Sequence, residues 1–83
     1  MSRKQKALAR LLCQSSDFTW TEAVTVMKLH GFVLLNGSGS SRKFIHEVTR
    51  VKVFIHEPHP ENILKRYAQE DLIQGLKNAG EIT

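Results

Sequence analysis

The spacing of apolar residues changes at Gly31, and this change limits the possible folds more than any other feature of the chain. Before Gly31, apolar residues recur every three or four positions, which is the period of one face of an α-helix. After it, residues 32–35 form a continuous apolar run and residues 42–56 alternate between apolar and polar side chains, as β-strands do. A chain of 83 residues has room for one domain. We therefore predict a single domain over residues 1–83.

Two capping boxes predict where helices begin. Ser2 with Gln5, and Thr19 with Glu22, have the three-residue spacing at which side chains and backbone N–H groups satisfy each other at a helix N-terminus. The sequence therefore predicts helices over about residues 3–14 and from Thr19 to about residue 30. Gly31 then suits the left-handed conformation that ends many helices.

Three short strands and a last helix complete the pattern. We predict strands at residues 32–35, 42–47 and 51–56, and the prolines of residues 57–60 stop the sheet because proline cannot donate to a strand ladder. In the second strand, one face carries Arg42, Phe44 and His46, and the other carries Lys43, Ile45 and Glu47. A helix starting near Tyr67 and ending before Gly80 follows, and Gly75 inside it costs about 1 kcal/mol relative to alanine, so this helix must rely on packing. The fold class predicted is α+β, in the order α-α-β-β-β-α, with an antiparallel three-stranded sheet covered by helices on one face.

The charge distribution is compatible with a polyanionic ligand. The chain has 12 basic and 8 acidic residues, a formal net charge of +4. Positive charge gathers in residues 3–10, in residues 42–52 and at Lys65 and Arg66, and a polyanion would be drawn to these places. Charge alone slightly favours the simpler interpretation of an ordinary solvated surface.

Several other classes of protein are disfavoured. Cys13 is the single cysteine, so the chain has no disulfide framework or cysteine zinc cluster, and we expect its thiol to be packed on the leucine-rich side of the first helix. His56 and His59 flank a proline turn without a third ligand at zinc-site spacing, and His30 is expected to be a surface or capping residue. No apolar run has the length of a membrane span. We predict a cytoplasmic protein without metal, small-molecule cofactor or membrane association.

Four short segments together resemble a known family. These are Lys-Leu-His-Gly-Phe at residues 28–32, Gly-Ser-Ser-Arg-Lys-Phe at 39–44, His-Glu-Pro-His-Pro at 56–60 and Leu-Lys-Asn-Ala-Gly at 76–80. Their order and spacing are similar to those of HicA toxins. The resemblance covers residues 19–82, and residues 1–16 would be an N-terminal helical extension found in longer members.

The resemblance implies a fold, an activity and a partner. HicA toxins resemble the double-stranded-RNA-binding domain and act as messenger-RNA endoribonucleases, without a cofactor. A HicB antitoxin encoded beside them holds them inactive. The partners implied here are therefore mRNA and a HicB-like antitoxin.

The chain departs from the family at one important position. The family pattern is Gly-Ser-x-His, and its histidine is the expected catalytic residue, but the match through Gly39 and Ser40 puts Arg42 there. Histidine exchanges protons near neutral pH, whereas arginine stays protonated and instead stabilises charge developing on a phosphate. Three cases follow: another residue takes over the catalytic role, or catalysis is weak, or it is absent.

The glycine-serine loop, the basic residues and the histidines supply the candidate site residues. We predict a metal-independent endoribonuclease in which Arg42 and Lys43 clamp a phosphate, loop serines donate hydrogen bonds, and His59 or His46 transfers the proton. The catalytic candidates are Arg42, Ser41, His59 and His46. The RNA-binding candidates are Ser40, Lys43, Lys52, His56, Lys65 and Arg66.

Three alternatives remain. The first is a non-catalytic RNA-binding module of the same fold. The second is an interaction protein whose acidic partner covers the sheet. The third and weakest is a DNA-binding helix-turn-helix, because residues 14–18 are not a typical tight turn and residues 20–29 lack a basic recognition face.

Overall fold

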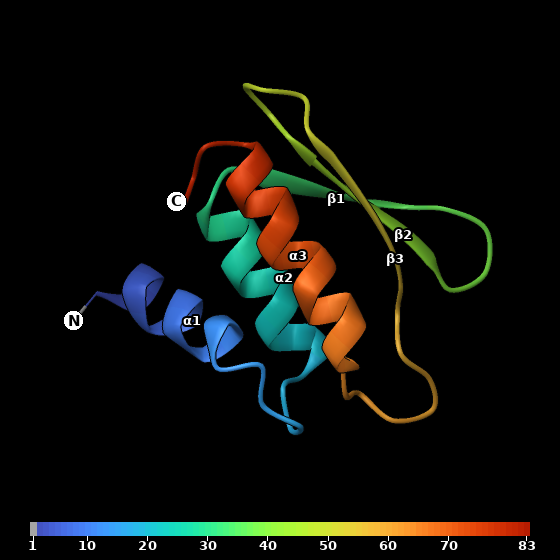
Figure 1. The fold of residues 1–83 in the computed structure, drawn as a ribbon. Coiled ribbons are helices and arrows are strands. Elements are labelled where there is room, and N and C mark those ends of the chain that lie inside the picture. Colours follow the sequence, from blue (N-terminus) through green and yellow to red (C-terminus); the bar gives the residue numbers. More distant parts are fainter. Residues whose placement is uncertain (1) are drawn as a thin grey trace.

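The computed structural model describes residues 2–83 and has the predicted order of elements (Figure 1). The helices are α1 (Arg3–Leu12), α2 (Trp20–Leu29) and α3 (Arg66–Asn78), and the strands are β1 (Phe32–Asn36), β2 (Ser41–His46) and β3 (Lys52–His56). The predicted α+β class and α-α-β-β-β-α order are confirmed. In the part of the chain that the structure describes, no helix is long and apolar enough to cross a membrane.

Both predicted capping boxes are present. The Ser2 hydroxyl accepts from the backbone N–H of Gln5 at 3.1 Å, and the Gln5 side chain accepts from the Ser2 N–H at 3.0 Å. Thr19 and Glu22 make the same reciprocal pair at the start of α2. Gly31 follows α2 with φ of +85°, the left-handed conformation predicted there.

The strands form one antiparallel sheet in the order β1-β2-β3, as predicted. All the helices lie on one side of it, and its other face is open (Figure 1). Phe44 is fully buried against the helices, opposite Leu34 on β1 and Val53 on β3. The arrangement of α2, the sheet and α3 is that of the double-stranded-RNA-binding domain, as the resemblance implied.

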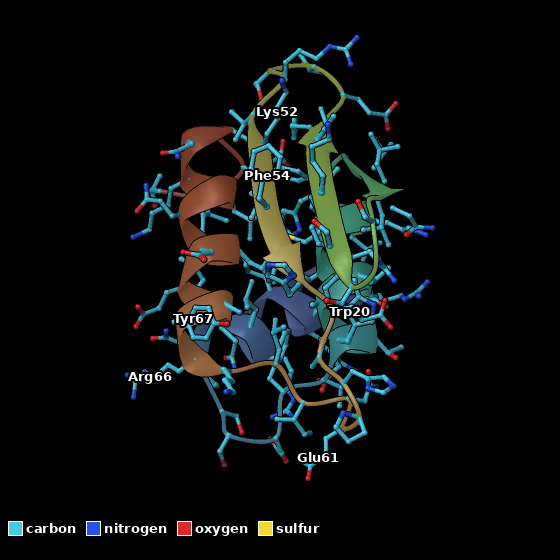
Figure 2. All side chains as sticks on the ribbon, turned by 90° about the vertical axis from the view of Figure 1, so that its right-hand side faces the viewer. Trp20, Lys52, Phe54, Glu61, Arg66 and Tyr67 are labelled. Atoms are coloured by element: carbon cyan, nitrogen blue, oxygen red, sulfur yellow. The ribbon has the colours of Figure 1, made fainter. Side chains whose placement is uncertain are left out.

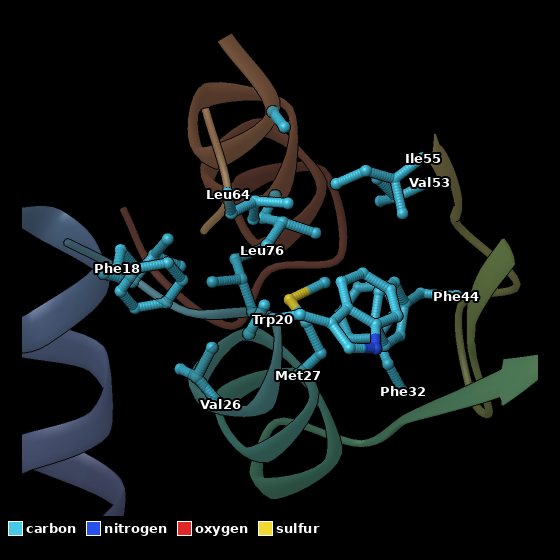
Figure 3. Packing of buried hydrophobic residues seen from close by; sticks show 14 of the residues in the cluster. Phe18, Trp20, Val26, Met27, Phe32, Phe44, Val53, Ile55, Leu64 and Leu76 are labelled. Carbon is cyan, nitrogen blue, oxygen red and sulfur yellow. The ribbon is translucent and has the colours of Figure 1, made fainter. Parts of the chain in front are cut away.

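The apolar core joins all three helices to the sheet (Figure 3). Trp20 packs against Phe44 with the ring centroids 5.8 Å apart. Leu11 of α1 is fully buried, so the N-terminal extension is part of the same core. The buried Gln69 amide of α3 donates to the carbonyl oxygens of Ser15 and Leu64, both at 2.9 Å. These bonds fix the connection after α1 against the start of α3.

Gly75 allows α3 to lie close to the sheet. A Cβ atom at this position would lie 2.3 Å from Cγ2 of Val53 on β3, closer than real carbon atoms approach. The helix therefore loses some intrinsic propensity at Gly75 but gains a close contact with β3. This is the packing that the sequence required of the last helix.

Two side chains differ from the prediction. The expectation that Cys13 is packed is wrong, because it is the C-terminal capping residue of α1 and its side chain is exposed. His30 is a helix-capping residue as expected, but it is buried rather than on the surface. Its Nδ1 lies 2.8 Å from the carbonyl oxygen of Val26 and must carry the proton to donate there.

Candidate nucleic-acid interface

A hollow of about 410 Å³ lies where the loop before β2 meets the proline turn after β3. It is lined by Gly39, Ser40, Arg42, Glu57, Pro58 and His59. A second hollow of similar size shares residues 57–59 and extends to Lys65 and Tyr67 at the start of α3. The two hollows adjoin at residues 57–59, and we call them together the turn groove.

Arg42 joins the two loops that form the groove. Its Nε donates to Oε1 of Glu57 at 3.0 Å, and its Nη1 donates to the carbonyl oxygens of Gly39 and Ser41, each at 2.8 Å. The backbone N–H of Glu57 also donates to the Ser40 carbonyl oxygen at 2.8 Å. The glycine-serine loop is therefore tied to the start of the proline turn.

Arg42 has N–H donors that these bonds do not use. A guanidinium carries five N–H donors, and the bonds to Glu57, Gly39 and Ser41 within residues 2–83 use only Nε and Nη1. The two hydrogens on Nη2 therefore have no hydrogen-bond partner among the described residues. Glu57 was not among the predicted site residues, because its position next to Arg42 depends on how β2 pairs with β3.

Two histidines reach the groove. His59 is exposed and lines both hollows. His56, at the end of β3, lines the hollow that extends to α3, and its Nδ1 lies 3.4 Å from the Ser40 hydroxyl oxygen. The groove therefore combines a fixed guanidinium, a serine hydroxyl and two imidazoles.

His46 lies elsewhere. It is buried at the far end of β2, about 13 Å along the strand from Arg42. Its Nδ1 accepts from the backbone N–H groups of Val48 and Thr49, and its Nε2 donates to Glu81 at 3.0 Å. Every polar atom of the ring is thus occupied inside the fold. This environment does not fit the proton-transfer role predicted for His46, and we do not retain that role.

The other predicted residues divide between the groove and the sheet. Lys65 lines the groove. Ser41 and Lys43 line a shallow hollow on the open face of the sheet, and Lys52 lines a different one next to α3. Arg66 projects into solvent and lies 3.8 Å from Glu70. The structure thus gathers Ser40, Arg42, His56, His59 and Lys65 and leaves Lys52 and Arg66 apart.

Two exposed aromatic residues were not predicted as site residues. Phe54 is 67% exposed on β3 and Tyr67 is 64% exposed on α3 (Figure 2). In the strand predicted at residues 51–56, Phe54 alternates with the apolar residues Val53 and Ile55 and shares a face with Lys52 and His56. An aromatic residue on that polar face was a signal in the sequence for a binding residue. Tyr67 lies at the first turn of a helix, where the sequence gives no comparable indication.

Metal ligands do not gather in this region. Across residues 2–83 no group of three or more His, Cys, Asp or Glu side chains is placed to hold a metal ion. The groups that line the groove are guanidinium, hydroxyl, imidazole and ammonium groups, together with the carboxylates of Glu57 and Glu61.

Fold and site together define a class of protein. An α-β-β-β-α domain of the double-stranded-RNA-binding type carries a groove lined by Ser40, Arg42, His56 and His59. Residues 20–80 match the family model described as the HicA toxin of bacterial toxin–antitoxin systems, and the chain belongs to this family. Comparison with curated proteins and with solved structures gave no match.

Proposed function

We propose that this HicA-family toxin is a metal-independent endoribonuclease that cleaves mRNA in the turn groove. The observation that carries the proposal is the placement of Arg42, Ser40, His56 and His59 around one groove. RNA contains its own nucleophile, the ribose 2′-hydroxyl. A protein therefore cleaves it by holding the adjacent phosphate and moving two protons.

Arg42 and Ser40 hold the phosphate in this mechanism. The two Nη2 hydrogens of Arg42 donate to its non-bridging oxygens and stabilise the charge that builds on them as the nucleophile attacks. The bonds from Arg42 to Glu57 and to the loop fix the guanidinium before RNA binds. Ser40 supplies a further donor.

His59 and His56 move the protons. One neutral imidazole removes the proton from the 2′-hydroxyl as its oxygen attacks phosphorus. One imidazolium protonates the departing 5′-oxygen as the P–O5′ bond breaks. The products are a 2′,3′-cyclic phosphate and a free 5′-hydroxyl. Imidazoles are suited to both steps because their ordinary pKa is near 6.5.

The family also implies a protein partner. We propose a HicB-like antitoxin whose acidic surface or inserted side chain closes the turn groove and pairs with Arg42. The toxin would act in the cytoplasm, where mRNA is available.

The test is cleavage of a single-stranded RNA by the purified protein in EDTA, with analysis of the product ends. The proposal expects fragments that end in a 2′,3′-cyclic phosphate and begin with a 5′-hydroxyl. Lys77→Ala, a charge deletion at the far end of α3, is the matched control and should cleave like the wild type. Intact RNA at high protein concentration would contradict the proposal.

A second candidate function rests on Arg42 itself. Since it stands where the family has its catalytic histidine, the chain could bind RNA or a partner without cleaving. This alternative expects salt-sensitive RNA binding without fragments, and a gain of cleavage in Arg42→His. Cleavage by the wild type excludes it.

A further inference from the structure

The open face of the sheet carries an aromatic ring that the fold does not cover. Phe54 is the middle residue of β3, and 67% of its surface is exposed (Figure 2). Lys43 is its partner across the ladder, and the Lys43 ammonium nitrogen lies 5.9 Å from the ring centroid. The Lys43 ammonium thus lies over one face of a ring that is otherwise largely exposed.

Positive charge continues along the strand. Lys52 lies two residues before Phe54 and His56 two residues after it, on the same face. Within residues 2–83 the ion pairs involve Arg10, Arg42, His46 and Arg66, so Lys43 and Lys52 are not neutralised. Asp71 of α3 is the acidic side chain that lines the hollow beside Lys52 and Phe54.

This surface is continuous with the turn groove. A shallow hollow on the sheet is lined by Ser41, Lys43, Phe54 and also by Arg42, which lines the groove as well. Ser41 lies opposite His56 in the ladder. The Arg42 side chain leaves β2 on the helix side and Phe54 lies on the open side, so a nucleic-acid strand bound at both passes over the end of the sheet where Ser41 pairs with His56.

We propose that Phe54 is a stacking platform for an unpaired base of single-stranded RNA, and that Lys43 binds the phosphate next to that base. The inference rests on the proposed function and names its substrate as an unpaired strand. Stacking on an aromatic ring accepts any base, because every base has a flat π-face. A duplex does not fit, because its bases are already stacked on one another.

A protein partner is a different occupant of the same face. The flanking aliphatic residues Val33, Leu35 and Ile45 would suit it. The aromatic ring between two uncompensated lysines, leading into a groove with phosphate-binding groups, favours RNA. The experiment distinguishes the two.

The experiment measures binding of a single-stranded 2′-O-methyl RNA that carries the fluorescent base 2-aminopurine. The methyl group removes the nucleophile, so binding is measured without cleavage. We expect the wild type to quench 2-aminopurine, as stacking does. Phe54→Leu should weaken binding by about tenfold and abolish the quenching, and Phe54→Tyr should preserve both. Val48→Ala, at an 84% exposed apolar residue in the β2–β3 turn, is the control and should bind like the wild type.

The outcomes separate this inference from the proposed function. Binding with Phe54-dependent quenching supports the stacking platform, whether or not unmodified RNA is cleaved. Cleavage by the wild type with unchanged binding and quenching in Phe54→Leu overturns the platform and leaves the proposed function in place. Absence of RNA binding by the wild type also overturns the platform.

Discussion

Arg42 has a structural role in addition to the phosphate contact proposed for it, and unfolding measurements test the structural role. Its bonds to Gly39, Ser41 and Glu57 hold the groove together before any ligand arrives. We predict that Arg42→Gln lowers the free energy of unfolding by about 1–3 kcal/mol, because the carbonyl groups of Gly39 and Ser41 and the half-buried Glu57 carboxylate lose a charged donor. Urea unfolding measures this. Glu57→Gln, which keeps the size of the side chain, should give a smaller loss, and an unchanged midpoint in Arg42→Gln would contradict the structural role.

Among the histidines, His46 is expected to contribute to stability rather than to cleavage. His46 is buried with its ring nitrogens satisfied, so His46→Gln should lower the free energy of unfolding by about 1–3 kcal/mol. Under conditions in which that variant is fully folded, its RNA cleavage should match the wild type. Circular dichroism and a cleavage assay at low temperature check both parts. Cleavage lost from folded His46→Gln would return His46 to the list of catalytic candidates.

At the scale of elements, the contact between α3 and β3 reverses the change in stability that replacing a helix glycine by alanine usually causes. Helix propensity alone predicts that Gly75→Ala stabilises the protein by about 1 kcal/mol. Because the new Cβ would meet Val53, we predict instead a loss of about 1–3 kcal/mol. Thermal or urea unfolding distinguishes the signs. Gln74→Ala, on the exposed side of the same turn, is the control and should be neutral or slightly stabilising.

The contact between α1 and α2 should depend on pH. Arg10 binds Glu22 at 2.6 Å and Asp17 at 2.8 Å. The Arg10 guanidinium lowers the pKa of Glu22, and the Ser15 hydroxyl followed by Arg10 lowers the pKa of Asp17. A carboxyl whose pKa is lowered by folding stabilises the fold above its ordinary pKa, near 4, and this contribution disappears as the pH falls through the lowered value.

The corresponding prediction compares the wild type with Arg10→Gln across pH. At pH 6 the variant should unfold at a lower urea concentration than the wild type, and the difference should shrink between about pH 4 and pH 2. A difference that stays constant over this range would show that Arg10 acts by packing rather than through its charge. Lys6→Gln, on the exposed side of α1, is the matched control.

The elements were predictable because their signals are local. Capping boxes lie within four residues, and the alternation from Arg42 to His56 needs only the strand period. The site was predictable in part. Ser40, Arg42 and His59 lie in family motifs, but the pairing of Arg42 with Glu57 depends on strand register. His46 shares a face with Arg42, and only the packing of Glu81 against it shows that this face is covered there.

At the scale of the whole molecule, the extension and the family core are one structure. The family match begins at residue 20, after α1, yet Leu11 is buried and Gln69 of α3 bonds to Ser15. The helices cover one face of the sheet and leave the other face open (Figure 1), and the turn groove lies at the end of the sheet. The function proposed here needs this division, because RNA must reach the groove from the uncovered side.

In the mechanism proposed above, RNA cleavage in the turn groove depends on proton transfer by His59. The most direct test is the single-turnover rate of RNA cleavage in EDTA by the wild type and by His59→Ala. Because His59 is exposed, the variant should unfold within about 0.5 kcal/mol of the wild type. We predict that its cleavage rate falls by about 100-fold or more, the loss typical of a missing general acid or base. An equal rate of cleavage by His59→Ala and the wild type would contradict the claim.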